Sequence, residues 1–142
     1  MCVLTGSEIL NFISPVLTTK HDDGTVPSYG MDGCLYTFRC EPPEYIDKWV
    51  LGQGCSLSVL TRETISMPLD VMGVTYLKST YSRQGIVLCN GGVIDNGYVG
   101  RVSAVLFNGG PRPVTLDFNG GIVQVVFHRM TQAAPGYKGR WM

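Results

Sequence analysis

The stretch Gly100-Arg-Val-Ser-Ala-Val-Leu-Phe107 is an apolar run that ends at a turn sequence, Asn108-Gly109-Gly110-Pro111. Two more such runs follow, Pro113–Phe118 and Ile122–His128, and the turn sequence Asn119-Gly120-Gly121 separates them. Short runs rich in β-branched and aromatic residues, divided by Asn-Gly turns, are typical of antiparallel strands. This region therefore predicts a series of short strands rather than helices.

The same pattern extends towards the N-terminus. Four further strands are expected at Leu35–Arg39, Cys55–Thr61, Asp70–Leu77 and Ile86–Cys89. Turn signals at Asn90-Gly91-Gly92 and Asn96-Gly97 lie between the later runs. Strands spaced by roughly 8–12 residues predict an all-β sandwich, jelly roll or barrel.

One helix is predicted, near the N-terminus. Thr5-Gly-Ser-Glu8 has the spacing of a capping box, apolar residues follow it, and Pro15 ends the pattern. We expect a single domain over residues 1–142, with an N-terminal helical segment at 1–14 and a C-terminal tail at 136–142.

The composition limits the class of protein. Charged residues make up 15% of the chain, and 11 basic side chains balance 11 acidic ones, so we expect no nucleic-acid interface. No apolar run approaches the length of a membrane helix, and Met1–Thr5 lacks the charged start of a signal peptide. So little charge suggests surface buried between subunits. We expect an oligomer in the cytoplasm, or in the host cytoplasm if the chain is viral.

The cysteines show no pairing pattern. They are Cys2, Cys34, Cys40, Cys55 and Cys89, with no Cys-x-x-Cys pair among them. Such scattered spacing favours free thiols in a reducing compartment, and we expect them to be small buried hydrophobic residues. No structural zinc site is expected, because neither histidine lies at ligand spacing from a cysteine.

An aspartate and a tyrosine stand out in Gly91-Gly-Val-Ile-Asp95-Asn-Gly-Tyr98-Val-Gly100. Two apolar residues lead into an aspartate at a turn, and an aromatic residue follows three positions later. One interpretation is structural, with Asp95 as a turn residue and Tyr98 covering the core. The other is a functional site with an acidic group beside an aromatic wall.

Two other segments carry polar groups that could bind an anion. Lys78-Ser-Thr-Tyr-Ser-Arg83-Gln-Gly85 combines two cations with several hydroxyls, which suits a phosphate chain, although the spacing of a Walker loop is missing. In the run Ile122–Phe127, Gln124 is an amide among β-branched residues. A buried amide needs hydrogen-bond partners, so Gln124 is either a structural tie or a ligand contact.

Together and in this order, these segments resemble the family that contains dUTP diphosphatases and dCTP deaminases. The resemblance implies the family's distorted jelly roll or β-barrel, assembled as a homotrimer whose sites are shared between subunits. Two lesser matches are to the deaminase branch, at Thr5–Ile13 and Thr61–Glu63. The four motifs correspond to Pro27–Asp32, Lys78–Gly85, Gly92–Gly100 and Gly121–Phe127.

The two branches of this family differ at positions that can be compared here. Deaminases carry a glutamate ten residues after the aspartate of the third motif, where it moves protons, and this chain has Val105. Deaminases also carry an arginine two residues before that aspartate, where this chain has Val93. The pattern Gly-Val-Ile-Asp-x-x-Tyr is that of the diphosphatases. The resemblance thus implies a deaminase-type scaffold with a diphosphatase site.

The resemblance also implies roles for individual residues. Asp95 would deprotonate a water that attacks the α-phosphorus of dUTP, giving dUMP and pyrophosphate, with Mg²⁺ bridging the phosphates and Asp32 near the metal through water. Tyr98 would pack on the deoxyribose and exclude a 2′-hydroxyl, while backbone groups of the hairpin Cys89–Ile94 would read the uracil. The other expected substrate contacts are Lys78, Ser79, Thr80, Arg83, Asn90, Gly92, Val93, Ile94 and Gln124.

The C-terminal tail departs from the diphosphatase pattern. Diphosphatases end in a glycine-rich segment with a phenylalanine that closes over the uracil, whereas Gly136-Tyr-Lys-Gly-Arg-Trp141 is closer to the deaminase ending. This tail could bring Lys138 and Arg140 to the phosphates beneath an aromatic lid. It could equally be a solvated terminus.

The sequence leaves three functions open: a dUTP diphosphatase, a diphosphatase for another deoxynucleoside triphosphate such as dCTP or dTTP, and a catalytically silent regulatory member of the family. The combination of Asp95, Tyr98, Ser79 and Gln124 favours an enzyme, because packing alone would not require it.

Overall fold

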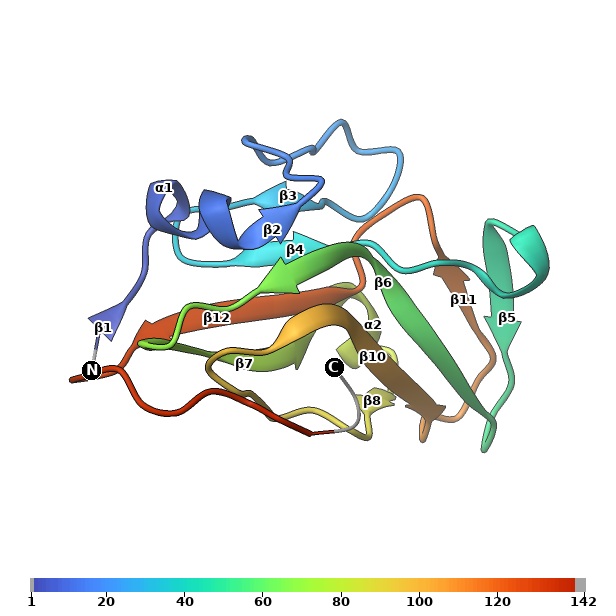
Figure 1. Cartoon of the computed structure of the whole chain (residues 1–142). Helices are drawn as coiled ribbons and strands as arrows, with labels where there is room; N and C mark the ends of the chain where they lie inside the picture. Colours follow the sequence, from blue (N-terminus) through green and yellow to red (C-terminus); the bar gives the residue numbers. More distant parts are fainter. Residues whose placement is uncertain (1, 140–142) are drawn as a thin grey trace.

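The computed structural model describes residues 2–139, which form antiparallel β-sheets with short helical turns (Figure 1). Most of the strands are short, in keeping with the frequent glycine turns. In chain order the elements are β1 (Cys2–Val3), α1 (Gly6–Ile9), the 3₁₀ turn η1 (Leu10–Phe12), β2 (Ile13–Ser14), β3 (Gly30–Met31), β4 (Tyr36–Phe38), η2 (Pro43–Tyr45), β5 (Lys48–Leu51), β6 (Ser56–Ser66), β7 (Val71–Leu77), α2 (Ser79–Ser82), β8 (Ile86–Leu88), β9 (Val93–Ile94), β10 (Val99–Asn108), β11 (Val114–Asp117) and β12 (Val123–Arg129).

The first sheet is built around β12. Its strand order is β3-β4-β12-β7-β9, with β1 paired to the end of β12. Val123, Val125 and Phe127 of β12 are buried, and the residues between them are partly exposed. This alternation is the two-residue period of a strand with one face on the core.

The second sheet has the order β2-β6-β10-β8, and β6 and β10 are its long strands. Leu106 of this sheet and Phe127 of the first belong to the same buried cluster, so the two sheets share one core. The ribbon β5–β11 lies at the end of the molecule opposite the N-terminus (Figure 1). This two-sheet arrangement confirms the expected all-β, jelly-roll-like fold.

The N-terminal segment forms the expected cap but a shorter helix. The backbone N–H and the hydroxyl of Thr5 donate to the Glu8 carboxylate at 3.3 and 3.1 Å. The α-helix ends at Ile9, and Ile13 already pairs with Ile65 of β6. The helical prediction therefore fails at both ends of residues 1–14, because pairing with the sheets overrides the helical pattern.

The seven predicted strands are all present, with shifted ends. The largest difference is β6, which continues to Ser66 rather than stopping at Thr61. Within residues 2–139, the strands that were not predicted are β1, β2, β3 and β9, with two residues each, and β5, with four. A short helix, α2, was also missed in the segment Lys78–Gly85.

The prediction of buried cysteines is wrong for four of the five. All five thiols are free, and Cys40 is the buried one. Burial in the core raises the pKa of Cys40 to about 12. Cys2, Cys34, Cys55 and Cys89 are exposed, since they lie in or next to turns and short edge strands rather than on buried faces.

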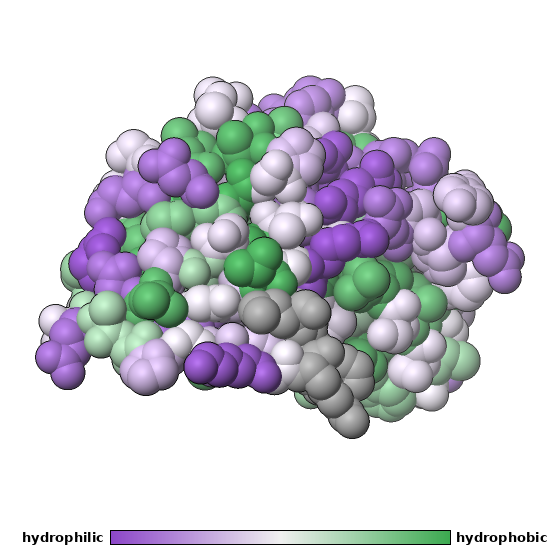
Figure 2. Space-filling view, viewed as in Figure 1, coloured by the Kyte–Doolittle hydropathy of each residue, from purple (hydrophilic) through white to green (hydrophobic). Residues whose placement is uncertain are grey.

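Several large apolar side chains remain at the surface. Tyr45 is 96% exposed, and Val50 and Val93 are each 63% exposed. Figure 2 shows hydrophobic patches interspersed with polar residues on one face of the molecule. No helix among residues 2–139 is long and apolar enough to cross a membrane. The exposed apolar surface is consistent with the expectation of an oligomer, which stays a prediction.

Candidate active site

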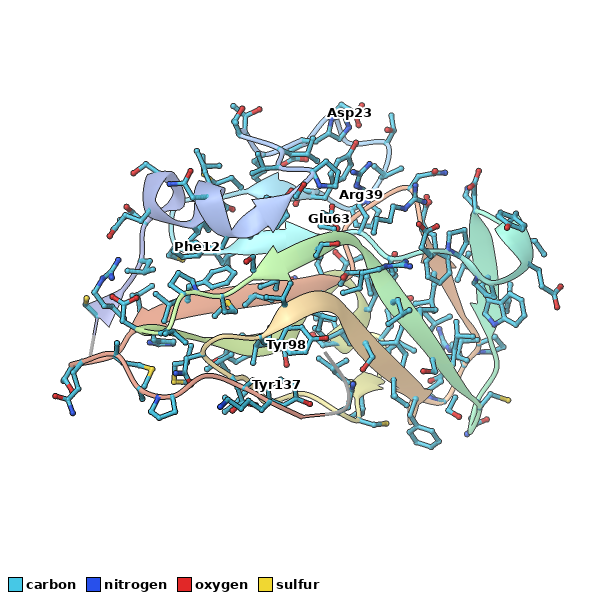
Figure 3. The ribbon with its side chains drawn as sticks, viewed as in Figure 1. Phe12, Asp23, Arg39, Glu63, Tyr98 and Tyr137 are labelled. Carbon is cyan, nitrogen blue, oxygen red and sulfur yellow. The ribbon has the colours of Figure 1, made fainter. Side chains whose placement is uncertain are left out.

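A pocket of about 410 Å³ lies beside the third predicted motif. Its walls come from β7, the hairpin before β9, the turn before β10, the first half of β10, and the C-terminal segment. Tyr98 and Tyr137 lie next to each other at this place (Figure 3). The residues that line the pocket are Thr75, Asn90, Val93, Ile94, Asp95, Tyr98, Val102, Ser103 and Tyr137.

The hairpin at one wall is tied to β7 by Thr75. The Gly92 N–H donates to the Thr75 hydroxyl oxygen at 2.8 Å, and the Thr75 N–H donates to the Gly92 carbonyl at 2.9 Å. The φ angle of Gly92 is +154°, which an L side chain rarely adopts. Thr75 was not predicted from the sequence, because its contact depends on the pairing of β7 with β9.

Asn90 fastens the same hairpin to β10. Its amide donates to the carbonyl and the hydroxyl oxygen of Ser103 at 2.9 and 3.0 Å, and its carbonyl oxygen accepts the Val105 N–H at 2.8 Å. The predicted contact residue therefore lines the pocket with its side chain already engaged. Its direct effect is to hold the wall in place.

Part of the hairpin backbone is also used inside the chain. The N–H groups of Cys89, Gly91 and Gly92 donate to Val105, Leu88 and Thr75 respectively. These three donors are thus committed before any base arrives. A base could be read only by the other backbone groups of residues 89–94.

The turn that carries Asp95 is held by its neighbour rather than by Asp95 itself. The Asn96 amide donates to the carbonyls of Leu69 and Ala134 at 3.0 Å and lies 3.3 Å from that of Pro135. Within residues 2–139, the exposed Asp95 carboxylate makes no hydrogen bond or ion pair. The interpretation of Asp95 as a turn-forming side chain therefore finds no support, and its carboxylate is available to the pocket.

Tyr98 is half-buried at the back of the pocket. Its hydroxyl donates to the Arg101 carbonyl at 2.6 Å, and burial raises the pKa of Tyr98. A Cβ atom at Gly100 would lie 3.2 Å from the Tyr98 hydroxyl, so the ring folds back over this glycine. The ring is held on one side by the start of β10.

The C-terminal segment contributes a second aromatic ring. The Tyr137 N–H donates to the Asn96 carbonyl at 2.8 Å, and the ring centroids of Tyr98 and Tyr137 are 5.5 Å apart. The sequence offered only a lid of unspecified position, because the contact brings together residues far apart in the chain. Lys138 is exposed and does not line the pocket, and Arg140 lies outside the described residues.

The first and second motifs meet away from this pocket. The Lys78 ammonium donates to the Ser28 hydroxyl at 2.8 Å, and burial lowers the pKa of Lys78. The Asp32 carboxylate accepts the Gly33 N–H at 2.8 Å, which lowers the pKa of Asp32, and it lies 3.3 Å from the Lys20 ammonium. Neither Lys78 nor Asp32 lines the pocket of Asp95.

The remaining predicted phosphate contacts are also separate from the pocket. Ser79, Thr80 and Arg83 are exposed on and after α2 and do not line it. Gln124 lies on β12 opposite Thr37 and Tyr76, and its side-chain amide makes no hydrogen bond within the described chain. The structural tie considered for Gln124 is thus not found. Within one chain, the predicted site residues therefore lie in two separate groups.

Residues 2–139 hold no group of three His, Cys, Asp or Glu side chains that could bind a metal ion. Asp95 is the carboxylate in the pocket. Mg²⁺ keeps several of its own waters and is commonly held through one or two carboxylates together with substrate phosphates. The donor set therefore fits a magnesium ion carried by a phosphorylated ligand, with Asp95 as a nearby carboxylate.

The fold is that of dUTPases and dCTP deaminases. The dCTP deaminase of Agrobacterium tumefaciens aligns with a TM-score of 0.68 at 14% identity, over 89% of this chain and 48% of that one. The dUTPase of Streptococcus mutans aligns with a TM-score of 0.55 at 20% identity, over 82% and 88% of the two chains. At this identity the likeness concerns the fold.

Sequence comparison then identifies the family. Residues 36–130 match the dCTP deaminase-like family, and the chain belongs to it. A dCTP deaminase of Thermococcus sibiricus is 34% identical over 82 residues, 57% of this chain and 52% of that protein. A dUMP-forming dCTP deaminase of Methanopyrus kandleri is 33% identical over 90 residues, 62% of this chain and 47% of that protein. The chain spans about half the length of these relatives.

Proposed function

We propose that this protein hydrolyses dUTP to dUMP and pyrophosphate. The observation that carries the proposal is the Asp95 carboxylate, which faces the pocket beside Tyr98 with no partner among the described residues. A carboxylate that is not used in a structural hydrogen bond or ion pair, and that lies next to an aromatic side chain, is suited to act as a general base on a water molecule.

In the proposed reaction, Asp95 accepts a proton from a water molecule while the oxygen of that water attacks the α-phosphorus. The bond from that phosphorus to the bridging oxygen breaks, and pyrophosphate leaves. The Tyr98 ring packs against the deoxyribose, and the hairpin fixed by Thr75 and Asn90 holds the uracil. Fixed polar groups reject cytosine, because the wrong edge would leave buried groups unpaired.

The group at position 105 supports hydrolysis rather than deamination. Val105 is an aliphatic residue whose N–H donates to the side chain of Asn90, a residue that lines the pocket. Its side chain cannot accept or release a proton, so it could not serve the exocyclic amine of a cytosine. The exposed Val93 likewise offers no polar atom from its side chain.

Magnesium would arrive with the triphosphate and supply charge neutralisation at the phosphates. The chain's own contribution is to orient the nucleotide and to hold the Asp95 carboxylate at the pocket. Asp32 would act on the metal only through water and from another part of the assembled site.

We further propose that a homotrimer completes the site. The pocket holds Asp95 and Tyr98 but not Ser79, Arg83 or Gln124, which are the expected phosphate contacts. A site divided in one chain becomes whole if the two groups meet across a subunit interface. The exposed apolar side chains support such an interface.

A panel of nucleotides tests the proposal. The protein is incubated with each deoxynucleoside triphosphate and Mg²⁺, and pyrophosphate and ammonia are measured separately. We expect pyrophosphate from dUTP and no ammonia from dCTP. The absence of pyrophosphate with every nucleotide would leave the silent regulatory function in its place.

The relatives favour a second candidate, which is deamination of dCTP. The matched relatives are named dCTP deaminases, including a dUMP-forming one. Stoichiometric ammonia from dCTP would establish this activity and would mean that Val105 does not occupy the position of the proton-moving group. Pyrophosphate from dCTP or dTTP, without ammonia, would instead indicate a diphosphatase for another base.

A further inference from the structure

The ladder between β6 and β10 contains an irregularity beside the pocket. Arg101 pairs with Thr64 and Ser103 pairs with Leu60, so three residues of β6 lie opposite Val102 alone. Val102 and Ser103 both line the pocket. Bulges commonly re-aim side chains next to functional sites, and this one lies where the wall of the pocket begins.

The side chain of Thr61 closes this bulge. Thr61 is completely buried, and its hydroxyl oxygen accepts the Val102 N–H at 3.0 Å while its proton goes to the Glu63 carbonyl at 2.8 Å. The Thr61 carbonyl accepts the Arg101 Nε–H at 2.5 Å. The hydroxyl thus replaces a missing ladder bond, and it is the acceptor that keeps the buried Val102 N–H satisfied.

The bulge is joined to the pocket through Tyr98. The Tyr98 hydroxyl donates to the carbonyl of Arg101 at 2.6 Å, and the Arg101 side chain is the one bound by Thr61. The position of that carbonyl decides where the hydroxyl end of the Tyr98 ring lies. Thr61 itself is not among the residues that line the pocket.

We propose that Thr61 is a positioning residue that acts through Tyr98 and sets how strictly the pocket rejects a ribonucleotide. This proposal rests on the proposed function, in which Tyr98 contacts the sugar. Deoxyribose and ribose differ by one hydroxyl, so their discrimination depends on the placement of the wall to within a fraction of an ångström. Loss of the Thr61 hydroxyl frees the Val102 N–H, relaxes the bulge and moves the Tyr98 anchor.

Two variants of Thr61 separate the hydroxyl from the shape of the side chain. Thr61→Val keeps the shape and removes the hydroxyl, whereas Thr61→Ser keeps the hydroxyl and serves as the control. For Thr61→Val we expect a higher KM for dUTP with kcat nearly unchanged, and a fall on the order of tenfold in the ratio of kcat/KM for dUTP to that for UTP. Thr61→Ser should retain the wild-type ratio. An unchanged ratio in Thr61→Val, with only a lower Tm, would overturn the proposal.

A second pair of variants serves if Thr61→Val does not fold. Arg101→Met removes the Nε–H donor to Thr61 at a side chain that is 38% exposed, and Glu41→Gln removes only the charge that lies 3.6 Å from the Arg101 guanidinium. We expect the dUTP to UTP ratio to fall in Arg101→Met and to stay constant in Glu41→Gln. Equal ratios in both would overturn the proposal.

One readout does not depend on the proposed reaction. The flip rate of the Tyr98 ring and the amide exchange of Val102, both measured by NMR without nucleotide, should rise in Thr61→Val and not in Thr61→Ser. Inactivity of the wild-type protein on every nucleotide would refute the proposed function alone, and the ring-flip comparison would still decide the positioning role. Identical flip and exchange rates in the two variants would reject it.

Discussion

The two groups of predicted site residues are supported in opposite ways. Around Asp95 the polar side chains are bound to the chain itself: Asn90 to β10, Asn96 to the C-terminal segment, and Tyr98 to Arg101. On and after α2, the side chains of Ser79 and Arg83 are exposed and have no polar partner among the described residues. One half of the site is thus built within a single chain, and the other half presents unused polar groups.

Under the proposed function, the half near α2 is the one that would depend on a second subunit. Preorganised groups lose little conformational freedom on binding, and the pocket around Asp95 is formed by one chain. The unused groups near α2 gain partners only from a ligand or from another subunit. Substitutions around Asp95 and substitutions near α2 should therefore differ in whether they change stability or only activity.

The largest effect is expected at Asp95. Asp95→Asn keeps the size of the side chain but cannot accept the proton of the attacking water, so turnover of dUTP should fall by about 10²–10⁴-fold. The free energy of unfolding and the affinity for dUMP, measured by denaturation and calorimetry, should change little because the turn is held by Asn96. Turnover at the wild-type rate in this variant would mean that Asp95 is a turn residue and not a general base.

Mixing two impaired variants tests the division of the site directly. Asp95→Asn and Arg83→Gln are denatured, mixed in equal amounts and refolded together. If one subunit supplies Asp95 and its neighbour supplies Arg83, random mixing should restore roughly a quarter of the wild-type activity in a trimer. If both groups act within one chain, the mixture should be no more active than its components. Light scattering should show three times the chain mass of 15.5 kDa.

A third experiment contrasts one residue from each half. Arg83→Gln should lower kcat/KM for dUTP by roughly 10–100-fold, the usual worth of a hydrogen bond from a charged group, and leave the free energy of unfolding within about 0.5 kcal/mol. Asn90→Ala should have the larger effect on stability. It should lower the free energy of unfolding by about 0.5–1.5 kcal/mol, because the Val105 N–H loses its acceptor. Urea denaturation and steady-state kinetics measure both. A larger loss of stability in Arg83→Gln than in Asn90→Ala would contradict this division of roles.

The elements recovered from the sequence are those with local signals. The long strands β6, β7, β10 and β12 have their own alternation, and Asp95 and Tyr98 reach the same pocket because they lie within one turn. The roles of Thr75 and Tyr137 were not recoverable, since each depends on hydrogen bonds between segments far apart in the chain.

The short strands and the exposure of the cysteines could not be predicted from the sequence, for a related reason. β9 has only two residues, and the pairing of β5 with β11 and of β9 with β7 decides the conformation of both strands. The type of residue favoured buried thiols, but Cys34 and Cys55 lie in or beside turns, where exposure follows from position rather than from residue type. The assignment of Gln124 needed the structure, because only the structure reveals whether the amide has a partner.

The smallest effect is expected at Glu63, which belongs to the bulge supporting the pocket half. Glu63 is fully buried and its Oε1 lies 3.4 Å from the Arg39 Nε (Figure 3). Among the described residues, its Oε2 has no hydrogen-bond partner, and burial raises the pKa of this carboxyl. The region that supports the pocket therefore contains one buried carboxyl oxygen whose hydrogen-bonding capacity the fold does not satisfy.

The raised pKa gives this group a signed dependence on pH. At low pH the carboxyl is protonated in both the folded and the unfolded chain and costs nothing. As the pH rises above the ordinary value for glutamate, about 4.3, the unfolded chain ionises more readily than the folded one, so stability is lost until the pH passes the folded-state pKa. Glu63→Gln removes this loss. Its free energy of unfolding, measured by urea denaturation, should therefore improve relative to wild type as the pH rises from about 4 to 8.

A matched variant distinguishes this effect from a general charge effect. Glu41→Gln removes a carboxylate whose side chain is 54% exposed, and its stability relative to wild type should stay within about 0.5 kcal/mol across the same range. Glu63→Gln should also leave the ratio of dUTP to UTP turnover unchanged, because the Glu63 group that binds Thr61 is its backbone carbonyl. Parallel pH profiles for Glu63→Gln and wild type would mean that Glu63 ionises in the fold as it does in water.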